Sequence, residues 1–198
     1  MIKRVFRRIC VFSGSRDGYN PAYLQAAHDL GATLATQNVE LVYGGGSMGL
    51  MGAIADSTLS YGGRAIGVLP EFLATEKLAH KGLNKVFVTQ DMHTRKAKMA
   101  ELSDAFIAMP GGLGTFEELF EMVTWAQLGV HAKPIGLLNT NRFYEPLLNL
   151  IEHAIQAGFI HETHRQLMIA DQDPSGLIEQ LQKQPELDLP KITDLDQT

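Results

Sequence analysis

The sequence predicts an α/β fold: a single-domain, Rossmann-like, doubly wound parallel sheet with helices on both faces. Three observations predict it. Short apolar runs alternate with helix-like stretches, the links between them are brief, and glycine-rich segments follow three of the apolar runs. Such alternation favours parallel strands, because each parallel pair needs a crossover connection, usually a helix. We expect one folded domain over residues 1–184 and a flexible polar tail over 185–198.

The predicted strands are short apolar runs, which are typical of strands buried on both faces of a parallel sheet. The clearest run is 105–109, which is continuous and closed by Pro110 and two glycines. Pro70 ends another run, because proline has no N–H to donate to a strand ladder. The expected strands are 9–12, 39–43, 64–69, 85–88, 105–109, 134–138 and 167–170.

The predicted helices follow from capping residues and apolar spacing. Asn20 and Pro21 begin the first helix, because Asn caps helices well and Pro suits the first turn. Asp91 caps the helix that contains Arg95. The expected helices are 21–37, 48–61, the stretch after Asp91, the stretch behind Gly114, 143–157 and 174–182; residues 71–84 show no clear pattern.

Composition and charge exclude several classes of protein. The net charge is −5 and no long basic run is present, which disfavours binding to a nucleic-acid backbone. No apolar span approaches membrane length, and the apolar run after the basic residues 1–8 is too short for a signal peptide. The single cysteine, Cys10, can form no internal disulfide and is expected to be buried. We therefore expect a cytoplasmic protein with no membrane or nucleic-acid partner.

The segment Pro-Gly-Gly-Leu-Gly-Thr after the strand at 105–109 is the strongest candidate for a binding site. A strand-to-helix turn presents free backbone N–H groups and the positive end of the helix dipole, which favours an anion such as a phosphate. Gly111, Gly112 and Gly114 lack a Cβ, so a ligand can approach the main chain closely. A structural alternative stays open, because Thr115 and Glu118 have the spacing of a capping box.

A second glycine segment, Gly44-x-Gly46-x-x-Gly49, matches the dinucleotide fingerprint formally, and the acidic Glu71 follows at a fitting distance. The fingerprint normally follows the first strand of a Rossmann fold, whereas this one follows the second. A mononucleotide phosphate or plain turn geometry fits better, and an NAD-dependent oxidoreductase is the weaker alternative.

Charged residues near these turns are candidates for chemistry. Met92, Arg95 and Met99 share one helix face, so Arg95 is expected to point inward or toward a partner, unless the helix simply has a solvated basic surface. A guanidinium at an apolar edge suits a phosphate or a base. Glu118 is placed to face a ligand in the glycine turn, whereas Glu117 and Glu121 lie on another side and are expected to be solvated.

A carboxylate beside a bound sugar phosphate can orient a water or stabilise positive charge at the anomeric carbon. A Glu118 side chain turned into the protein interior, or sealed off from any cavity beside the glycine turn, would rule that role out. His161 and His164 form a surface or interface patch in our interpretation, since spacing supplies no third metal ligand. We expect no bound metal.

Three motifs together resemble the LOG ("Lonely guy") family of cytokinin riboside 5′-monophosphate phosphoribohydrolases. They are Gly-Gly-Gly-Ser-Met-Gly-Leu-Met-Gly at 44–52, Met-His-Thr-Arg-Lys-Ala-Lys-Met at 92–99 and Pro-Gly-Gly-Leu-Gly-Thr-Phe-Glu-Glu at 110–118, and the likeness runs from about 10 to 159. Members are sometimes labelled lysine decarboxylases, but no lysine here is placed as a pyridoxal phosphate anchor should be.

The resemblance implies a homodimer or a dimer-based oligomer that needs no cofactor. Its substrate would be a purine nucleoside 5′-monophosphate, with water cleaving the N-glycosidic bond to release free base and ribose 5-phosphate. The resemblance assigns catalysis to Arg95 and Glu118. It assigns substrate binding to Gly45, Gly46, Lys96, Gly111, Gly112, Gly114, Thr115 and Thr124. Ser13, Gly14 and Met92 are further candidates for substrate binding, because they lie in the first glycine-rich segment and on the helix face of Arg95.

One departure from the family pattern concerns base recognition. Lys77 stands where many relatives have an acidic residue, and the neighbouring Glu76 is a possible substitute. Whether the substrate is a cytokinin nucleotide or AMP stays open, as does a different class of function: a non-catalytic nucleotide or cofactor carrier of the same fold.

Overall fold

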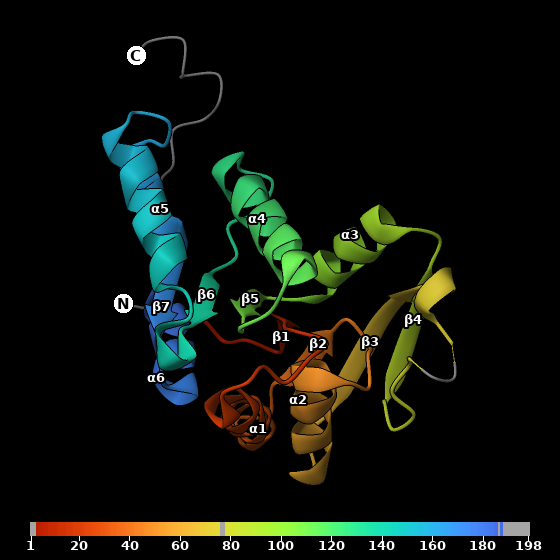
Figure 1. Cartoon of the computed structure of the whole chain (residues 1–198). Helices are drawn as coiled ribbons and strands as arrows, with labels where there is room; N and C mark the ends of the chain where they lie inside the picture. The colour runs from red at the N-terminus through yellow and green to blue at the C-terminus, as the bar shows by residue number, and fades with distance from the viewer. Residues whose placement is uncertain (1–2, 76–77, 186, 188–198) are drawn as a thin grey trace.

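The computed structural model describes residues 3–75, 78–185 and 187, in which seven strands form one sheet in the order β4-β3-β2-β1-β5-β6-β7 (Figure 1). Every neighbouring pair is parallel. The strands are β1 Arg8–Phe12, β2 Glu40–Tyr43, β3 Ala65–Pro70, β4 Lys85–Thr89, β5 Ala105–Ala108, β6 Ile135–Leu138 and β7 Met168–Asp171. The doubly wound parallel sheet expected from the alternating pattern is thereby confirmed.

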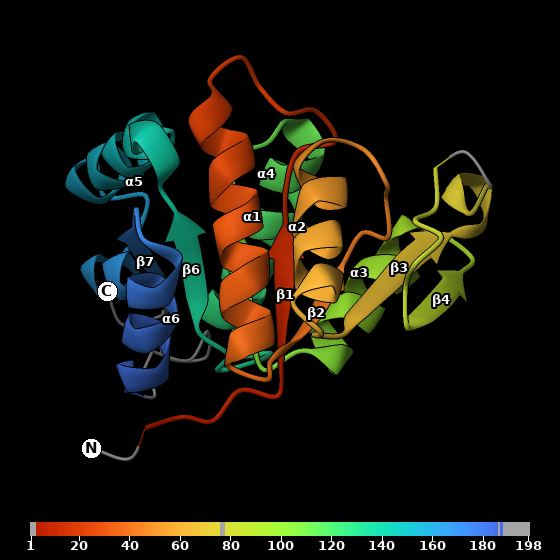
Figure 2. The same cartoon turned by 90° about the horizontal axis from the view of Figure 1, so that it is seen from below.

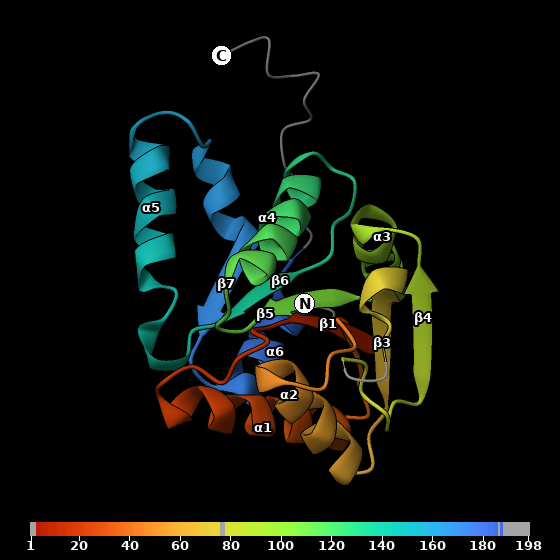
Figure 3. The same cartoon turned by 45° about the vertical axis from the view of Figure 1, so that its right-hand side comes forward.

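Six α-helices lie on both sides of this sheet in the described residues. They are α1 Pro21–Thr36, α2 Gly49–Ser60, α3 Met92–Leu102, α4 Leu113–Gln127, α5 Glu145–Gln156 and α6 Pro174–Lys183. Helices α1, α2 and α6 cover one face, with α1 and α2 side by side (Figure 2). Helices α3 and α4 cover the other face, and α5 lies beside them (Figure 3). None of these helices is long and apolar enough to cross a membrane.

The core is divided into two layers by the alternation of side chains along each strand. In β1, Ile9 and Val11 pack with α1, α2 and α6, whereas Cys10 and Phe12 pack with α3 and α4. All four side chains are almost completely buried, because helices cover both faces of a central strand. The expectation that Cys10 is a buried small hydrophobe is confirmed.

The order of the strands places a crevice between β1 and β5. The chain moves from β1 outward to β4, then returns to β5 on the other side of β1 and moves outward again to β7. Ligands of open α/β sheets bind at such a switch point, at the carboxyl ends of the strands. The loops after β1 and β5, which contain two of the three glycine-rich segments, meet there.

Local start and stop signals were mostly confirmed. The Asn20 side chain accepts a hydrogen bond from the N–H of Ala22, and Asp91 forms a capping box with Thr94. The strand expected at 64–69 is β3, which ends one residue later: Pro70 is its last residue and pairs with Thr89. Residues 71–84, expected to be irregular or weakly helical, include the 3-10 helix η1 Glu71–Leu73.

Candidate active site

The glycine turn before α4 forms a backbone cradle, which we define as residues 111–115. Helix α4 begins at Leu113 with Gly112 as N-cap, and no side chain caps its first N–H groups. The capping-box alternative was therefore wrong, because Thr115 lies inside the helix rather than before it. A Cβ at Gly112 or Gly114 would have no atom within 4 Å, so the backbone there is open to a ligand.

Gly111 is required for a different reason. A Cβ on Gly111 would overlap the Thr115 side chain and lie 2.9 Å from the backbone nitrogen of Gly14. The loops after β1 and β5 are therefore in close contact, and a hydrogen bond from Gly14 N to Pro110 O (3.1 Å) joins them. These contacts bring the predicted residues Gly14, Gly111 and Thr115 together at the switch point.

A cavity of about 620 Å³ lies beside the cradle. A second cavity, of about 560 Å³, lies at the opposite end of the sheet. The loop after β1 and residues Gly111 and Gly112 line the larger one, and Tyr23, Leu50 and Phe143 form apolar walls. Its size suits a small molecule, for which pockets of roughly 300–1,000 Å³ are usual. Ser13 directly precedes Gly14, which lines this cavity. Ser13 is buried, and its hydroxyl has no hydrogen-bond partner among the described residues.

Arg95 and Glu118 form an ion pair between α3 and α4. Arg95 Nη1 donates to Glu118 Oε1 at 2.7 Å, and Arg95 Nε donates to the carbonyl oxygen of Val68 at 3.0 Å. The other terminal nitrogen, Nη2, would be 2.5 Å from a Cβ at Gly44. The pair is thus held at the carboxyl edge of the sheet, between the end of β3, the loop after β2 and the second turn of α4. The inward orientation expected for Arg95 is confirmed.

Burial sets the electrostatics of this pair. The side chains of Arg95 and Glu118 are only 8% and 10% exposed. Burial raises the pKa of the Glu118 carboxyl, and the positive charge and hydrogen bond of Arg95 act in the opposite direction. Neither side chain lines the cavity beside the cradle. Glu118 is turned toward Arg95 in the interior, the arrangement expected to count against its role, and a ligand held in that cavity would not meet it; only the 10% of its side chain that stays exposed leaves a route to a ligand.

Lys96 forms a second link between α3 and α4. Its side chain is 4% exposed, and its ammonium group pairs with Glu117 and lies 3.0 Å from Glu121 Oε2. The expectation that Glu117 and Glu121 are merely solvated was therefore wrong, because both carboxylates neutralise a buried cation. Since Lys96 and Arg95 are both buried, the alternative of a solvated basic helix surface is also wrong for these two residues.

The glycine loop after β2 is held by the segment 78–80. His80 N donates to Gly45 O at 2.9 Å, and Ser47 N donates to Leu78 O at 3.0 Å. Gly45 has φ +74°, a conformation that favours glycine. Met92 lies at the same edge, with its sulfur 3.9 Å from Arg95 Nη1. Glu76 and Lys77 lie outside the described residues.

Thr124 lies apart from the other predicted site residues. It is exposed on α4 and follows Leu113 by 11 residues, which is about 16 Å along a helix. Within one chain Thr124 therefore does not reach the cradle.

The histidine patch also differs from its prediction. His164 is buried rather than on the surface, and neither ring nitrogen has a hydrogen-bond partner in the described part of the chain. The Nδ1 of His161 accepts from Thr163 N. No three His, Cys, Asp or Glu side chains gather as a metal site among the described residues.

Two contributors to the site were missed from the sequence. The Tyr144 hydroxyl donates to the Met109 carbonyl oxygen at 2.7 Å, directly before the cradle. Val68 contributes only its carbonyl oxygen, to Arg95. No local pattern marks either residue, because both contacts join segments more than 25 residues apart.

Comparison with solved structures supports the same architecture. The molybdenum cofactor binding protein from Rippkaea orientalis superposes with a TM-score of 0.66 at 24% identity, over 89% of this chain and 95% of that one. The Moco carrier protein from Chlamydomonas reinhardtii gives 0.66 at 25% identity, over 89% and 95% of the two chains. At this level of identity the likeness shows the fold alone.

Comparison of sequences is more specific. The family model described as "Possible lysine decarboxylase" matches residues 51–181. The Arabidopsis thaliana cytokinin riboside 5′-monophosphate phosphoribohydrolase LOG3 is 47% identical, covering 92% of this chain and 85% of the relative. The probable phosphoribohydrolase LOGL2 of Oryza sativa subsp. japonica is 46% identical, covering 92% and 75%. The chain therefore belongs to the LOG family, the family that its glycine and arginine motifs resemble.

Proposed function

We propose that this chain is a nucleotide phosphoribohydrolase. Its substrate is a purine nucleoside 5′-monophosphate, either a cytokinin riboside 5′-monophosphate or AMP, and its products are the free base and ribose 5-phosphate. The printed names of relatives at 46–47% identity support the reaction class. The observation that best supports a catalytic site is the Arg95–Glu118 pair, whose acid lies one turn beyond the cradle on the same helix.

The cradle is suited to the phosphate of such a substrate. The uncapped N–H groups at the start of α4 point out of the helix, and its dipole adds partial positive charge there. Gly112 and Gly114 leave room for phosphate oxygens next to the main chain. In this proposal the phosphate fixes the ribose so that its anomeric carbon lies toward the second turn of α4.

Glu118 and Arg95 would then act on the N-glycosidic bond. As that bond breaks, its electron pair leaves with the purine and positive charge develops on the ribose. The Glu118 carboxylate stabilises that charge and orients the water whose oxygen bonds to the anomeric carbon. A proton from the water balances the charge of the departing base, and Arg95 assists the base or holds the phosphate. In a buried setting such charge interactions are stronger than in water.

Burial also sets a requirement for this mechanism. Since Arg95 and Glu118 are about nine-tenths buried, the ribose must reach them past the open backbone of Gly112 and Gly114. Gly44 on the other side already contacts Arg95 and leaves no space for a ligand between them. We therefore place the substrate along the cradle rather than over the loop after β2.

The test is hydrolysis of AMP and of N6-substituted AMP by Glu118→Gln and Glu118→Ala. We expect turnover to fall by about two orders of magnitude or more, with the circular dichroism spectrum unchanged. Glu117→Gln is the matched control, because Glu117 pairs with Lys96 and not with Arg95. Hydrolysis by the Glu118 variants near the wild-type rate would show that the assigned role is wrong.

The alternative function is a nucleotide or cofactor carrier without turnover. Two proteins of the same fold are named as a molybdenum cofactor binding protein and a Moco carrier protein, which is the reason to test this alternative. A carrier needs the glycine cradle but not the buried acid beside Arg95, so the pair favours an enzyme. Incubation with AMP distinguishes the two: free adenine supports the hydrolase, and tight binding without adenine supports the carrier. Spectral titration with a nicotinamide dinucleotide tests the weaker oxidoreductase alternative.

A homodimer is part of this proposal. Leu113, Phe120 and Leu128 lie on one stripe of α4 and are 86%, 38% and 44% exposed. Their spacing of seven and eight residues keeps them on one helix face, and exposed apolar faces of this kind are typical of interfaces. Thr124 lies on the same stripe, so pairing of α4 helices would bring it toward the site of a second chain.

We also propose a cytoplasmic location without nucleic-acid or membrane partners.

A further inference from the structure

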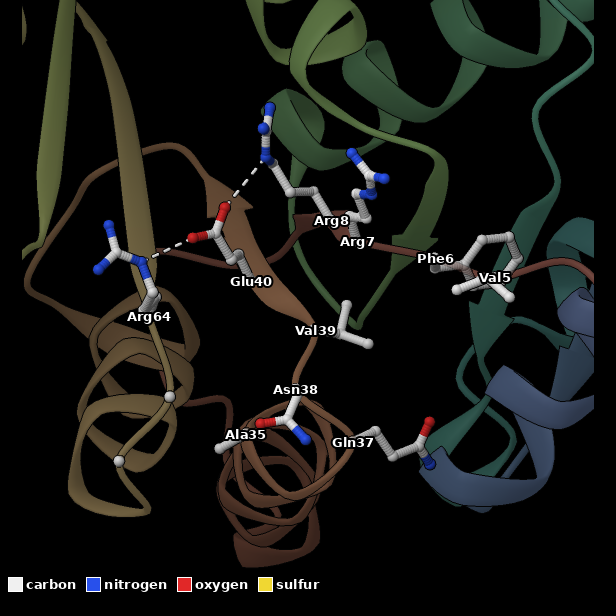
Figure 4. A pocket seen from close by; sticks show the side chains of 12 residues that line it. Val5, Phe6, Arg7, Arg8, Ala35, Gln37, Asn38, Val39, Glu40 and Arg64 are labelled. Atoms are coloured by element: carbon white, nitrogen blue, oxygen red, sulfur yellow. Dashed lines mark hydrogen bonds and ion pairs between the residues drawn. The ribbon is translucent and has the colours of Figure 1, made fainter.

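A second hollow lies at the edge of the sheet opposite the cradle. It is formed where β1 and β2 begin and where α1 and α2 end, and its volume is about 560 Å³ (Figure 4). The proposed reaction takes place at the carboxyl ends of the strands, so this hollow is not used by it. Its volume lies within the range of small-molecule pockets, roughly 300–1,000 Å³.

The lining of this hollow is positively charged, although the chain has a net charge of −5. Arg7, Arg8 and Arg64, three of the eight arginines in the sequence, line it with a single carboxylate, Glu40. Both oxygens of Glu40 are already occupied, one by Arg8 Nε at 3.0 Å and one by Arg64 Nε at 2.6 Å (Figure 4). The Asp104 carboxylate lies next to the lining, where it accepts from the backbone N–H groups of Arg7 and Arg8 at 2.7 and 2.9 Å. Three guanidinium groups against these two carboxylates still leave an excess of positive charge.

The three arginines have different roles. Arg8 is structural, because its Nη1 also donates to the carbonyl oxygen of Leu102 at the end of α3. Arg64 uses only Nε toward Glu40, and its side chain is 61% exposed, so its terminal N–H groups remain available. Arg7 forms no ion pair within the described residues. An ion-pair network that merely joined β1 to β2 would need Arg8, Glu40 and Arg64, but not Arg7.

The rest of the lining suits an organic ligand rather than a bare ion. Phe6 and Val39 are buried and provide an apolar floor. The side-chain amides of Gln37 and Asn38 form no hydrogen bonds in the described part of the chain. Asn38 has φ +57°, the left-handed conformation that ends α1 at the rim of the hollow.

We propose that this hollow is a second binding site, which takes a small organic oxyanion with phosphate or carboxylate groups. Arg7 and Arg64 lie on opposite sides of the Glu40–Arg8 pair (Figure 4), so each binds a separate anionic group of the ligand, as guanidinium groups do in forked pairs. Phe6 and Val39 contact the apolar part of the ligand. Binding in this hollow does not require the proposed hydrolysis, because the hollow and the cradle lie at opposite ends of the strands.

The test is calorimetric titration of the full chain at low salt with pyrophosphate and, separately, with citrate. Binding at the cradle is told apart from binding at this hollow because only the latter depends on Arg7 and Arg64, which line the hollow and not the cradle. We expect at least one probe to bind, and its affinity to fall about tenfold or more in Arg7→Gln/Arg64→Gln, since the variant removes two guanidinium groups that bind the anion. Binding of pyrophosphate alone assigns a phosphorylated ligand, and binding of citrate alone assigns a carboxylate.

The matched control is Arg165→Gln/Lys183→Gln. It removes the same charge from two exposed ion pairs outside both hollows. We expect it to bind the probe like the unaltered chain, and Arg7→Gln/Arg64→Gln to retain any hydrolysis of AMP. Equal weakening by the two double variants, or no binding of either probe at millimolar concentration, would overturn the proposal. A chain that fails to hydrolyse AMP but still shows Arg7-dependent binding would refute only the proposed function.

Discussion

The hydroxyl of Tyr144 donates a hydrogen bond of 2.7 Å to the carbonyl oxygen of Met109, the residue directly before the Pro-Gly-Gly turn. Tyr144 is fully buried, and burial raises the pKa of its hydroxyl, so that group stays a neutral donor. The N–H of Tyr144 donates in turn to Asn139 Oδ1 at 2.7 Å. The segment after β6 therefore fixes the peptide from which the cradle starts, and Tyr144 is a positioning residue for it.

Tyr144→Phe tests this arrangement. The variant leaves the Met109 carbonyl buried without a donor, so we expect unfolding free energy to fall by about 1–3 kcal/mol. We also expect KM for AMP to rise about tenfold, because the cradle is no longer held in place. Hydrolysis of adenosine, which has no phosphate, should be changed much less. Steady-state kinetics with both substrates and urea denaturation measure these effects.

Thr58→Val is the control for this prediction. The Thr58 hydroxyl is buried and donates to Ile54 O within α2, away from the cradle. We expect a similar loss of stability without a change in KM. If Tyr144→Phe also leaves KM unchanged, the contact supports the fold only.

Gly114 gives a prediction in which stability and binding change in opposite directions. A Cβ at Gly114 meets no atom within 4 Å, and the residue lies inside α4. Gly114→Ala should therefore raise unfolding free energy by about 0.5–1 kcal/mol, because alanine favours the helix. If the phosphate binds along this backbone, the new methyl group obstructs it, and affinity for ribose 5-phosphate should fall about tenfold.

The contrasting variant is Gly111→Ala. Its new methyl group meets Thr115 and the backbone of Gly14 rather than a ligand. We expect it to lower unfolding free energy by about 1–3 kcal/mol, since the two loops must separate. Calorimetry with ribose 5-phosphate and thermal melting compare both variants. Unchanged binding in Gly114→Ala would refute the proposed position of the phosphate.

The sequence predicted the strands and the glycine turns well, because these depend on local spacing, whereas for Arg95 it left an inward orientation and a solvated helix surface both open. It did not predict which partner each charged residue would find. Glu118 pairs with Arg95 and Glu117 with Lys96 across 23 and 21 residues, through the packing of α3 on α4. Thr115 fitted a capping box in the sequence, but Gly112 takes the N-cap position two residues before Gly114 and leaves Thr115 inside the helix.

Two histidines, the half-buried His131 and the buried His164, predict loss of stability in acid. Burial, with the nearby Lys133 charge, lowers the pKa of His131 to about 4, and burial with His161 lowers the pKa of His164. Between about pH 6.5 and pH 4 the unfolded chain binds more protons than the folded chain, so stability falls as the pH falls. Glu118 acts oppositely, because burial raises its pKa and protonation relieves a buried charge.

Urea denaturation at pH 7.5 and pH 4.5 measures this dependence. We expect unfolding free energy to fall over that interval, with His131 accounting for on the order of 1–2 kcal/mol of the fall, allowing for its partial exposure. His131→Asn should reduce the fall by that amount, because asparagine does not titrate. An equal fall in the variant would mean that carboxylates, and not His131, cause the acid sensitivity.

The apolar stripe on α4 predicts the state of assembly. Phe120 lies at its centre, between the exposed Leu113 and Leu128. If this stripe forms the homodimer interface, Phe120→Glu buries a charge there and should weaken association by at least about 100-fold, or about 3 kcal/mol. Sedimentation velocity across a range of concentrations should then show a monomer. Leu150→Glu is the control, because Leu150 is similarly exposed on α5, outside the stripe; a dimer that persists in Phe120→Glu, or is lost in Leu150→Glu instead, would place the interface elsewhere.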